Sequence, residues 1–184
     1  PEQSPDPDRP FNTSVMIGSD GHLVASYRKI HLFDIDIPNG VTYAESSAVT
    51  PGEVLCLAPL DGFTVGLSVC YDLRFPELYR GLVARGADVL TVPAAFTLQT
   101  GKDHWDVLLR ARAIESQSYV IAPNQWGHHG RGRAPWGKTQ IIDPWGTVLS
   151  CVGEHEGVCF ASMDKAYLER CRTHLPALKH RRLD

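Results

Sequence analysis

The sequence predicts an α/β fold, and three observations support this prediction. Between residues 63 and 123, three apolar strand-like segments alternate with two segments of helical periodicity. Tight-turn signatures separate further pairs of strand-like segments on both sides of that region, which indicates antiparallel hairpins. The length of 184 residues is enough for one domain with a complete buried core. Such an alternation builds a parallel or mixed sheet that binds ligands beyond the carboxyl ends of its strands.

The beginning of the chain differs from the rest of the sequence. Residues 1–10 are rich in Pro and acidic side chains and have no apolar periodicity, so we interpret them as a loop or linker before a domain at 11–184. The first predicted hairpin pairs residues 14–18 with residues 22–27 across a Ser-Asp-Gly turn. This hairpin places Lys29 where a strand ends.

A second hairpin comes after a long connection. Residues 34–53 contain several Pro and Gly residues and are predicted to be irregular, which in a compact domain is more often functional than idle. Glu45 lies within this connection. The hairpin itself is predicted from residues 54–59 and 63–70, and Cys70 is its last residue.

The centre of the chain is predicted to alternate helix and strand, at residues 76–85, 88–93, 104–117 and 119–123. Pro76 is a good first helical residue, and Gly86 is a typical residue after a helix end. Because the carboxyl ends of parallel strands meet at one edge of a sheet, we expect Cys70, Phe96 and Asn124 to share that edge.

The last third is predicted to add a hairpin, a strand and a helix. The hairpin pairs residues 138–143 with residues 147–152 across Pro144-Trp145-Gly146. Residues 157–162 form the next predicted strand, and Asp164 caps the final helix. We find no internal repeat.

Composition excludes several classes of function. The formal net charge of -3 and the pI of about 6.3 predict no nucleic-acid partner. Charged, Gly or Pro residues interrupt every apolar stretch before the roughly 20 residues that span a membrane, so a soluble protein is expected. Five cysteines without paired spacing favour a reducing, cytoplasmic location. His128 and His129 accompany no metal-binding motif, so we predict no metal and no cofactor.

Cys70 is the predicted nucleophile, because a strand end before a helix presents a side chain to a pocket and to backbone amides. Most cysteines are instead small buried hydrophobic residues, and this interpretation suits Cys56, Cys151, Cys159 and Cys171.

A thiol with a pKa of about 8.5 needs a nearby cation or base. Lys29 is the predicted cation, favouring the thiolate and later stabilising an oxyanion. The alternatives are a solvated Lys29 and a solvated loop carboxylate at Glu45. A cysteine–histidine pair with His31 or His104 is a further alternative with no supporting spacing.

Three ordered motifs carry the most specific information. They are Tyr27-Arg28-Lys29-Ile30-His31-Leu32-Phe33-Asp34, Glu45 before Pro51-Gly52, and Cys70-Tyr71-Asp72-Leu73-Arg74-Phe75-Pro76-Glu77. Further motifs are Pro93-Ala94-Ala95-Phe96, His104-Trp105, Arg110-Ala111-Arg112-Ala113-Ile114-Glu115 and Asp143-Pro144-Trp145-Gly146. Together they resemble the nitrilase superfamily of carbon–nitrogen hydrolases over nearly all of the chain after Pro10.

The resemblance implies a four-layer αββα sandwich and a Glu-Lys-Cys triad. Carried over to this sequence, Cys70 is the nucleophile, Lys29 is the lysine and Glu45 matches a second, assisting glutamate. In the family the general-base glutamate lies ahead of the segment matching Phe11. We therefore expect this chain to lack that glutamate and the N-terminal portion of the sandwich.

The implied reaction is hydrolysis of a small amide through an acyl-thioester. Cys70 attacks the carbonyl, Lys29 and the Tyr71 N–H stabilise the oxyanion, ammonia leaves, and water releases the acid. Phe96 is expected to line the same site. Within the family, the motif Phe75-Pro76-Glu77-Leu78, the helix with Trp105, and the ending His174-Leu175-Pro176 with His180-Arg181-Arg182 resemble the branch of deaminated glutathione amidases. Substrates of that branch carry carboxylates, so we predict that Arg131 or Arg133 binds that group. A solvated basic loop is the alternative.

Several functions share these features. An ω-amidase or an N-carbamoyl amide hydrolase would use the same residues with a different acyl pocket. A non-catalytic binding or assembly subunit could keep the fold with an incomplete triad. The family also implies a homo-oligomer, at least a dimer, and a small-molecule amide as the other partner.

Overall fold

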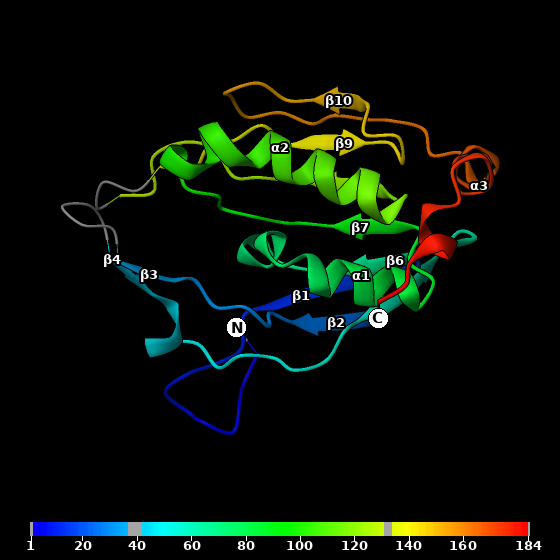
Figure 1. Ribbon diagram of the computed structural model, residues 1–184. Coiled ribbons are helices and arrows are strands. Elements are labelled where there is room, and N and C mark those ends of the chain that lie inside the picture. The colour runs from blue at the N-terminus through cyan, green and yellow to red at the C-terminus, as the bar shows by residue number, and fades with distance from the viewer. Residues whose placement is uncertain (1, 37–41, 131–133, 184) are drawn as a thin grey trace.

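The computed structural model describes residues 2–36, 42–130 and 134–183. A mixed six-stranded sheet forms its centre, in the order β10-β9-β8-β7-β6-β5 (Figure 1). The bounds are β5 Leu57–Leu60, β6 Phe63–Leu67, β7 Val89–Thr91, β8 Tyr119–Ala122, β9 Gln140–Ile142 and β10 Val148–Cys151. The neighbours β6, β7 and β8 are parallel, and the outer pairs are antiparallel. The predicted mixed sheet is therefore confirmed.

Helices α1 (Pro76–Ala84) and α2 (Leu98–Ser116) lie together on one face of the sheet (Figure 1). Helix α1 starts with Pro76 in its first turn, and its buried Leu82 packs on the sheet. A Cβ atom at Gly66 would lie 3.0 Å from Leu82 Cδ1, so this glycine lets the helix approach β6 closely. Among the described residues, no helix is long and apolar enough to cross a membrane.

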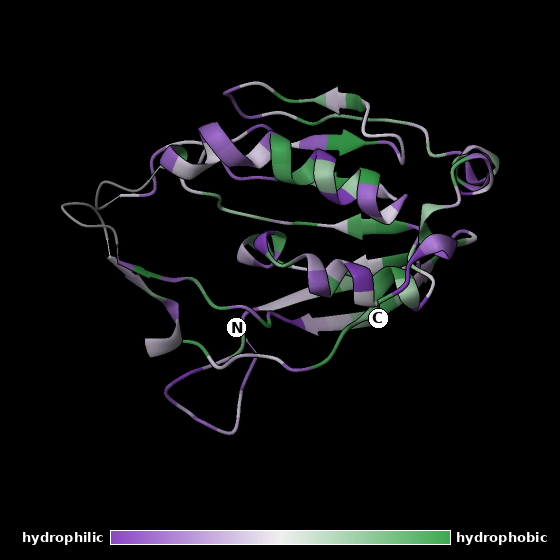
Figure 2. Ribbon diagram, viewed as in Figure 1, coloured by the Kyte–Doolittle hydropathy of each residue, from purple (hydrophilic) through white to green (hydrophobic). Residues whose placement is uncertain are grey.

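The core lies between the helices and the central strands. Figure 2 shows β7 as hydrophobic, whereas α1 and α2 mix hydrophobic and hydrophilic residues as helices at a surface do. Trp105 of α2 is fully buried, and its Nε1 donates to the Lys138 carbonyl at 2.8 Å. Burial of the ring and of its polar atom fixes α2 over the strands that lead to the site.

Two small hairpins stand beside the sheet. The first comprises β1 (Thr13–Ile17) and β2 (Leu23–Arg28), and the second β3 (Asp34–Asp36) and β4 (Thr42–Ala44). Met16, Ala25 and Tyr27 of the first hairpin pack against the core. Tyr27 anchors the end of β2 most firmly, because it is 1% exposed.

Helix α3 (Lys165–His174) lies against the loop before β7. Asp164 caps it as predicted, accepting a hydrogen bond from the Ala166 N–H at 2.8 Å. Asp88 joins the helix to the sheet: its carboxylate accepts from Arg172 at 2.9 Å and from Lys165, and also from the Thr64 N–H at 3.0 Å. A short 3-10 helix comes next at Ala177–His180.

Most predicted elements are confirmed, but three predictions were wrong in part and one was wrong. Helix α2 begins at Leu98, ahead of the predicted residue 104, and residues 157–162 form no strand. The connection at 34–53 holds the β3–β4 hairpin and a 3-10 helix at Glu45–Ser47, although residues 37–41 lie outside the described part. The strand predicted to end at Cys70 ends at Leu67.

Candidate active site

Lys29 lies directly after β2 and is held by its backbone. Its N–H donates to the Asn12 carbonyl at 2.8 Å, and its carbonyl accepts from the Gly52 N–H at 2.8 Å. A Cβ atom at position 52 would lie 2.2 Å from the Arg28 carbonyl oxygen, so only glycine permits this approach. The Lys29 side chain is 3% exposed, which contradicts the alternative of a solvated lysine.

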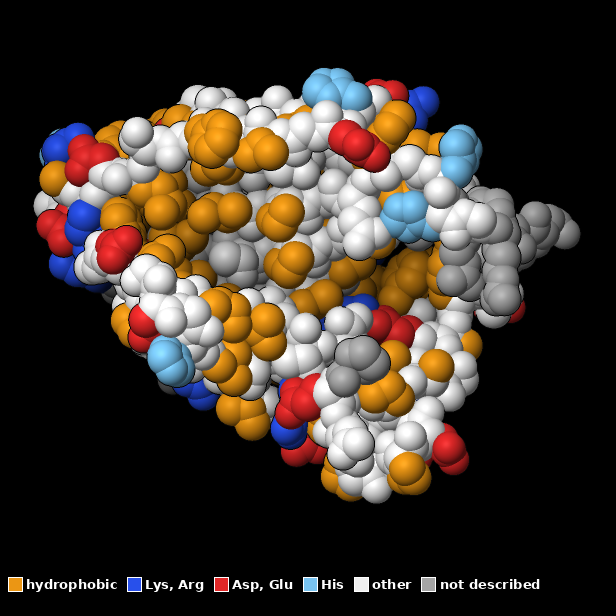
Figure 3. Space-filling model, turned by 180° about the vertical axis from the view of Figure 1, so that it is seen from behind, with side chains coloured by type: hydrophobic (Ala, Val, Ile, Leu, Met, Phe, Trp, Pro, Cys, Tyr) orange, Lys and Arg blue, Asp and Glu red, His pale blue; other side chains and the backbone are white. Residues whose placement is uncertain are grey.

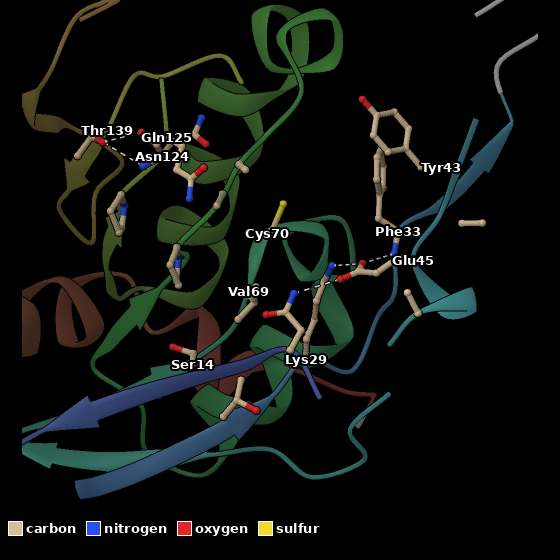
Figure 4. A pocket seen from close by; sticks show the side chains of 18 of the residues that line it. Ser14, Lys29, Phe33, Tyr43, Glu45, Val69, Cys70, Asn124, Gln125 and Thr139 are labelled. Atoms are coloured by element: carbon tan, nitrogen blue, oxygen red, sulfur yellow. Dashed lines mark hydrogen bonds and ion pairs between the residues drawn. The ribbon is translucent and has the colours of Figure 1, made fainter. Parts of the chain in front are cut away.

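The Lys29 ammonium pairs with the carboxylate of Glu45 (Figure 4). Glu45 Oε2 also accepts from the Phe33 N–H at 2.7 Å, and Oε1 accepts from Asn12 Nδ2 at 3.1 Å. Burial alone would raise the pKa of Glu45, but the bonds from Lys29, Phe33 and Asn12 outweigh it and hold the pKa below its ordinary value. Glu45 is therefore a fixed carboxylate and not a solvated loop residue.

Cys70 begins a 3-10 helix, Cys70–Arg74, immediately after the extended Val69. Its φ of 50° lies in the left-handed region, which is unfavourable for a residue with a side chain. The Cys70 N–H donates to the Pro93 carbonyl at 3.0 Å, which ties this turn to the end of β7. The sharp turn directs the sulfur into the open space between Asn124 and Glu45 (Figure 4).

Burial and nearby charges both act on the pKa of the Cys70 thiol. Burial raises the pKa of the Cys70 thiol, and the Lys29 ammonium and the Ala95 N–H only partly oppose this. The carboxylates of Glu45 and Asp72 raise the pKa further. Lys29 lowers the pKa of the thiol, as predicted, but the desolvation of the sulfur outweighs this single cation. Deprotonation of this thiol needs a base during the reaction.

Two cavities meet at Cys70. The larger one, of 920 Å³, is lined by Cys70, Lys29, Glu45 and Asn124 among others. The smaller one, of 270 Å³, is lined by Cys70, Tyr71, Arg74, Phe96, Thr100 and His129 among others. Two aromatic residues line both cavities, Phe33 just before β3 and Tyr43 of β4. The face of the molecule in Figure 3 is visibly hollowed. These volumes are typical of small-molecule sites.

The sheet edge brings the expected residues together. Cys70, Phe96 and Asn124 line the two cavities, as predicted. The Phe96 N–H donates to Asn124 Oδ1 at 2.9 Å, which joins the ends of the two neighbouring segments, and Phe96 lines the smaller cavity. The N–H of Tyr71 belongs to the first turn of the 3-10 helix, where amides have no partner inside the helix.

Arg131 and Arg133 lie outside the described residues. The structure instead presents Arg74, which sequence analysis did not single out. Its guanidinium lies 5.2 Å from the centre of the Phe96 ring and 6.0 Å from that of Tyr71, and contacts His104 Nδ1 at 3.4 Å. No carboxylate of the described residues pairs with Arg74. Its place in the motif, four residues after Cys70, was the available signal.

The histidine alternatives find no support in the geometry. His31 Nδ1 lies 2.7 Å from Asp72 Oδ1, and its ring stacks on Phe75 with centroids 3.7 Å apart. His104 contacts Arg74. Neither histidine lines the larger cavity. Within the described ranges, no three His, Cys, Asp or Glu side chains form a group that could hold a metal ion.

Comparisons with known proteins agree with these observations. A family model described as carbon-nitrogen hydrolase matches residues 1–173. A Synechocystis protein named deaminated glutathione amidase is 50% identical over 175 residues, which cover 93% of this chain and 64% of the relative. The chain thus spans less than two thirds of that relative's length.

Two solved structures are informative. The NitFhit protein of Caenorhabditis elegans matches with a TM-score of 0.92 and 43% identity, over 98% of this chain and 44% of the other. An amidase from Nesterenkonia matches with a TM-score of 0.78 and 29% identity, over 96% of this chain and 60% of the other. A mutant of that amidase is described with the acetamide moiety of fluoroacetamide added covalently at its active-site cysteine. These matches confirm the predicted fold class.

Proposed function

Because the chain belongs to the carbon–nitrogen hydrolase family, we propose that it hydrolyses the amide bond of a small carboxylate-bearing amide, with Cys70 as nucleophile. One observation carries the proposal. Cys70 stands on a strained turn at a cavity whose wall also holds the buried Lys29–Glu45 pair. A nucleophile, a cation and a carboxylate at one cavity are the groups that acyl transfer needs.

The proposed reaction has two stages. Cys70 Sγ attacks the amide carbonyl as its proton is removed, and the Lys29 ammonium and the Tyr71 N–H stabilise the oxyanion. The C–N bond then breaks, the nitrogen gains a proton, and ammonia leaves an acyl-thioester. Water attacks the thioester carbonyl, which frees the acid and restores the thiol. Glu45 holds Lys29 in place. The family resemblance implies a further glutamate, ahead of the segment matching Phe11 and matched by no residue of this chain, as the general base that takes the thiol proton and passes it to the leaving nitrogen.

The substrate proposal rests on Arg74. Arg74 lines a cavity and pairs with no carboxylate in the described part of the chain, so its planar donor fork is available to an anion. The second cavity adjoins Cys70, so an anionic end bound there would leave the amide carbonyl near the sulfur. The relative's name, deaminated glutathione amidase, agrees with a substrate that bears carboxylates. An ω-amidase or an N-carbamoyl amide hydrolase is the second candidate, since the same two cavities suit those substrates.

Release of ammonia from a panel of amides tests this function. We expect turnover of carboxylate-bearing amides, no turnover by Cys70→Ala, and no covalent product of that variant with fluoroacetamide by mass spectrometry. Arg74→Met should raise KM for carboxylate-bearing amides and leave KM for neutral amides unchanged. Arg110→Met, whose arginine donates to the Gly146 carbonyl, is the control. An inactive wild-type protein that still binds such amides would favour the non-catalytic binding subunit.

Two further properties are proposed with the function. We propose a homo-oligomer, supported by exposed apolar side chains on the β1–β2 hairpin, where Val15, Ile17 and Leu23 are more than half exposed at 56%, 55% and 60%. Hydrophobic side chains also gather over much of the face in Figure 3. We propose a reducing, cytoplasmic location, supported by five free thiols. Light scattering of the wild type and of Val15→Lys tests the homo-oligomer. Localisation of a tagged protein tests the cytoplasmic location.

A further inference from the structure

Asp72 is a fully buried carboxylate that the reaction scheme does not use. It is 0% exposed, and four groups donate to it. Oδ2 accepts from the Tyr27 hydroxyl at 2.8 Å and from the Val69 N–H at 2.8 Å. Oδ1 accepts from the His31 N–H at 3.1 Å and contacts His31 Nδ1 at 2.7 Å. Each carboxylate oxygen thus has two hydrogen-bond partners among the described residues, and a buried charge requires such partners to replace water.

These donors come from the two segments that carry the reacting groups. Tyr27 and His31 stand two residues before and two residues after Lys29, while Val69 and Asp72 stand on either side of Cys70. The Tyr27 hydroxyl also accepts from the Ile30 N–H at 3.2 Å, so it holds the chain on both sides of Lys29. Asp72 therefore joins the backbone around the lysine to the backbone around the nucleophile.

We propose that Asp72 is a positioning residue that fixes Cys70 Sγ relative to the Lys29 ammonium; this inference rests on the proposed amidase function. Two observations support it. The left-handed conformation of Cys70 is unfavourable for a residue with a side chain, so neighbouring bonds must hold the turn. The Val69 N–H and Asp72 itself provide such bonds on both sides of it.

Electrostatics does not explain why a carboxylate stands here. The negative charge of Asp72 raises the pKa of the Cys70 thiol, which opposes the formation of a nucleophile. A residue kept for its charge should do the reverse. The saturated set of donors, together with the stacking of His31 on Phe75 at an interplanar angle of 6°, indicates that Asp72 acts through geometry.

Two buried tyrosines provide a matched test. Tyr27→Phe removes the hydroxyl that donates to Asp72, whereas Tyr79→Phe removes a hydroxyl whose partner is Ser68 Oγ at 2.8 Å. Tyr27 and Tyr79 are 1% and 0% exposed, so both variants remove one buried hydroxyl and keep all charges. Tyr27→Phe also removes the acceptor of the Ile30 N–H. The readouts are kcat and KM for an amide, the melting temperature, and the rate at which fluoroacetamide alkylates Cys70, followed by mass spectrometry.

In that alkylation Cys70 Sγ forms a bond to the CH₂ carbon, the C–F bond breaks, fluoride leaves with the electron pair, and the thiol proton passes to solvent base. We expect Tyr27→Phe to lower kcat and the alkylation rate on the order of tenfold to a hundredfold with KM unchanged. Tyr79→Phe should change kcat and the alkylation rate by less than about twofold, although it also lowers the melting temperature. Equal kinetic losses in the two variants, or none in Tyr27→Phe, would overturn the proposal.

A second pair of variants covers the case in which Tyr27→Phe does not fold. His31 is 27% exposed, so its replacement is milder. His31→Asn keeps a side-chain N–H that can reach Asp72, and should retain most of kcat, whereas His31→Ala should not. Equal kcat in the two variants would count against the proposal. A wild-type protein that releases no ammonia would refute the proposed function, while the alkylation rates would still test the positioning.

Discussion

We predict that replacing Glu45 lowers the free energy of unfolding more than replacing Lys29, although the two residues form one ion pair. Breaking a buried ion pair typically costs about 3–5 kcal/mol, because the remaining charge loses its partner. After Lys29→Met, Glu45 keeps two donors, the Phe33 N–H at 2.7 Å and Asn12 Nδ2 at 3.1 Å. We therefore expect a loss near the lower end, about 3 kcal/mol of unfolding free energy.

Glu45→Ala leaves the positive charge of Lys29 buried without its partner. The Lys29 ammonium is 3% exposed, and Glu45 is its acceptor among the described residues. We expect a loss near the upper end, about 5 kcal/mol, because no other bond compensates the desolvated ammonium. The double variant Lys29→Met/Glu45→Ala should lose clearly less than the sum of the two single losses, since it leaves no buried charge.

Urea unfolding followed by circular dichroism measures all three variants at neutral pH. A larger loss in Lys29→Met than in Glu45→Ala, or additive losses in the double variant, would refute the reasoning. The pH dependence has a definite sign. The pKa of Glu45 is lowered from its ordinary value of 4.5, so its stabilisation is present above that pH and is lost as pH falls through the lowered pKa. The difference in unfolding free energy between wild type and Lys29→Met should therefore become smaller as the pH falls through that range.

Three further predictions test other parts of the structure. Burial raises the pKa of the Cys70 thiol, so the rate of its alkylation by fluoroacetamide should still increase above about pH 8.5. A rate, followed by mass spectrometry, that reaches a plateau below that pH would contradict this prediction. Gly101→Ala should lower unfolding free energy by about 1–2 kcal/mol, since the new Cβ would lie 2.4 Å from Trp136 Cβ. Gly81→Ala is its control, because its nearest neighbour is a mobile leucine methyl group and the helix gains up to about 1 kcal/mol. Asp88→Ala should cost about 3 kcal/mol in the same urea assay, and a loss below about 1 kcal/mol would show that the cations of α3 contribute little.

Much of the fold could be predicted because its signals are local. Helix α1 is bounded by Pro76 and by Gly86, whose φ is 96°, and both residues act on their own backbone. The start of α2 could not be predicted, because a glycine inside a helical segment is normally unfavourable. Gly101 is tolerated there since Trp136, far along the sequence, packs against its bare Cα. The alternation in residues 157–162 predicts a strand, but pairing requires a partner, which no local pattern specifies.

In the candidate site, too, local motifs could be predicted from the sequence and contacts between distant residues could not. Lys29, Glu45 and Cys70 could be predicted because each lies in a motif that a family resemblance identifies. The contribution of Asn12 could not, since it is visible only when its side chain meets Glu45 and its carbonyl meets the Lys29 N–H. The contacts of Asp72 span more than 40 residues for both Tyr27 and His31, so no local spacing reveals them.

The charges at the site imply when the nucleophile forms. Lys29 contributes one positive charge near Cys70, and Glu45 and Asp72 contribute two negative ones, so the three groups sum to one negative charge. In the proposed reaction, a buried thiol in that field would keep its proton until a substrate carbonyl is present and a base accepts the proton. We therefore propose that the Lys29 ammonium acts mainly on the oxyanion, where charge would develop during the reaction, and less on the resting sulfur. An increase of the Cys70 alkylation rate in Glu45→Gln at low pH, alongside a loss of amide turnover, would be the direct consequence of this division of roles.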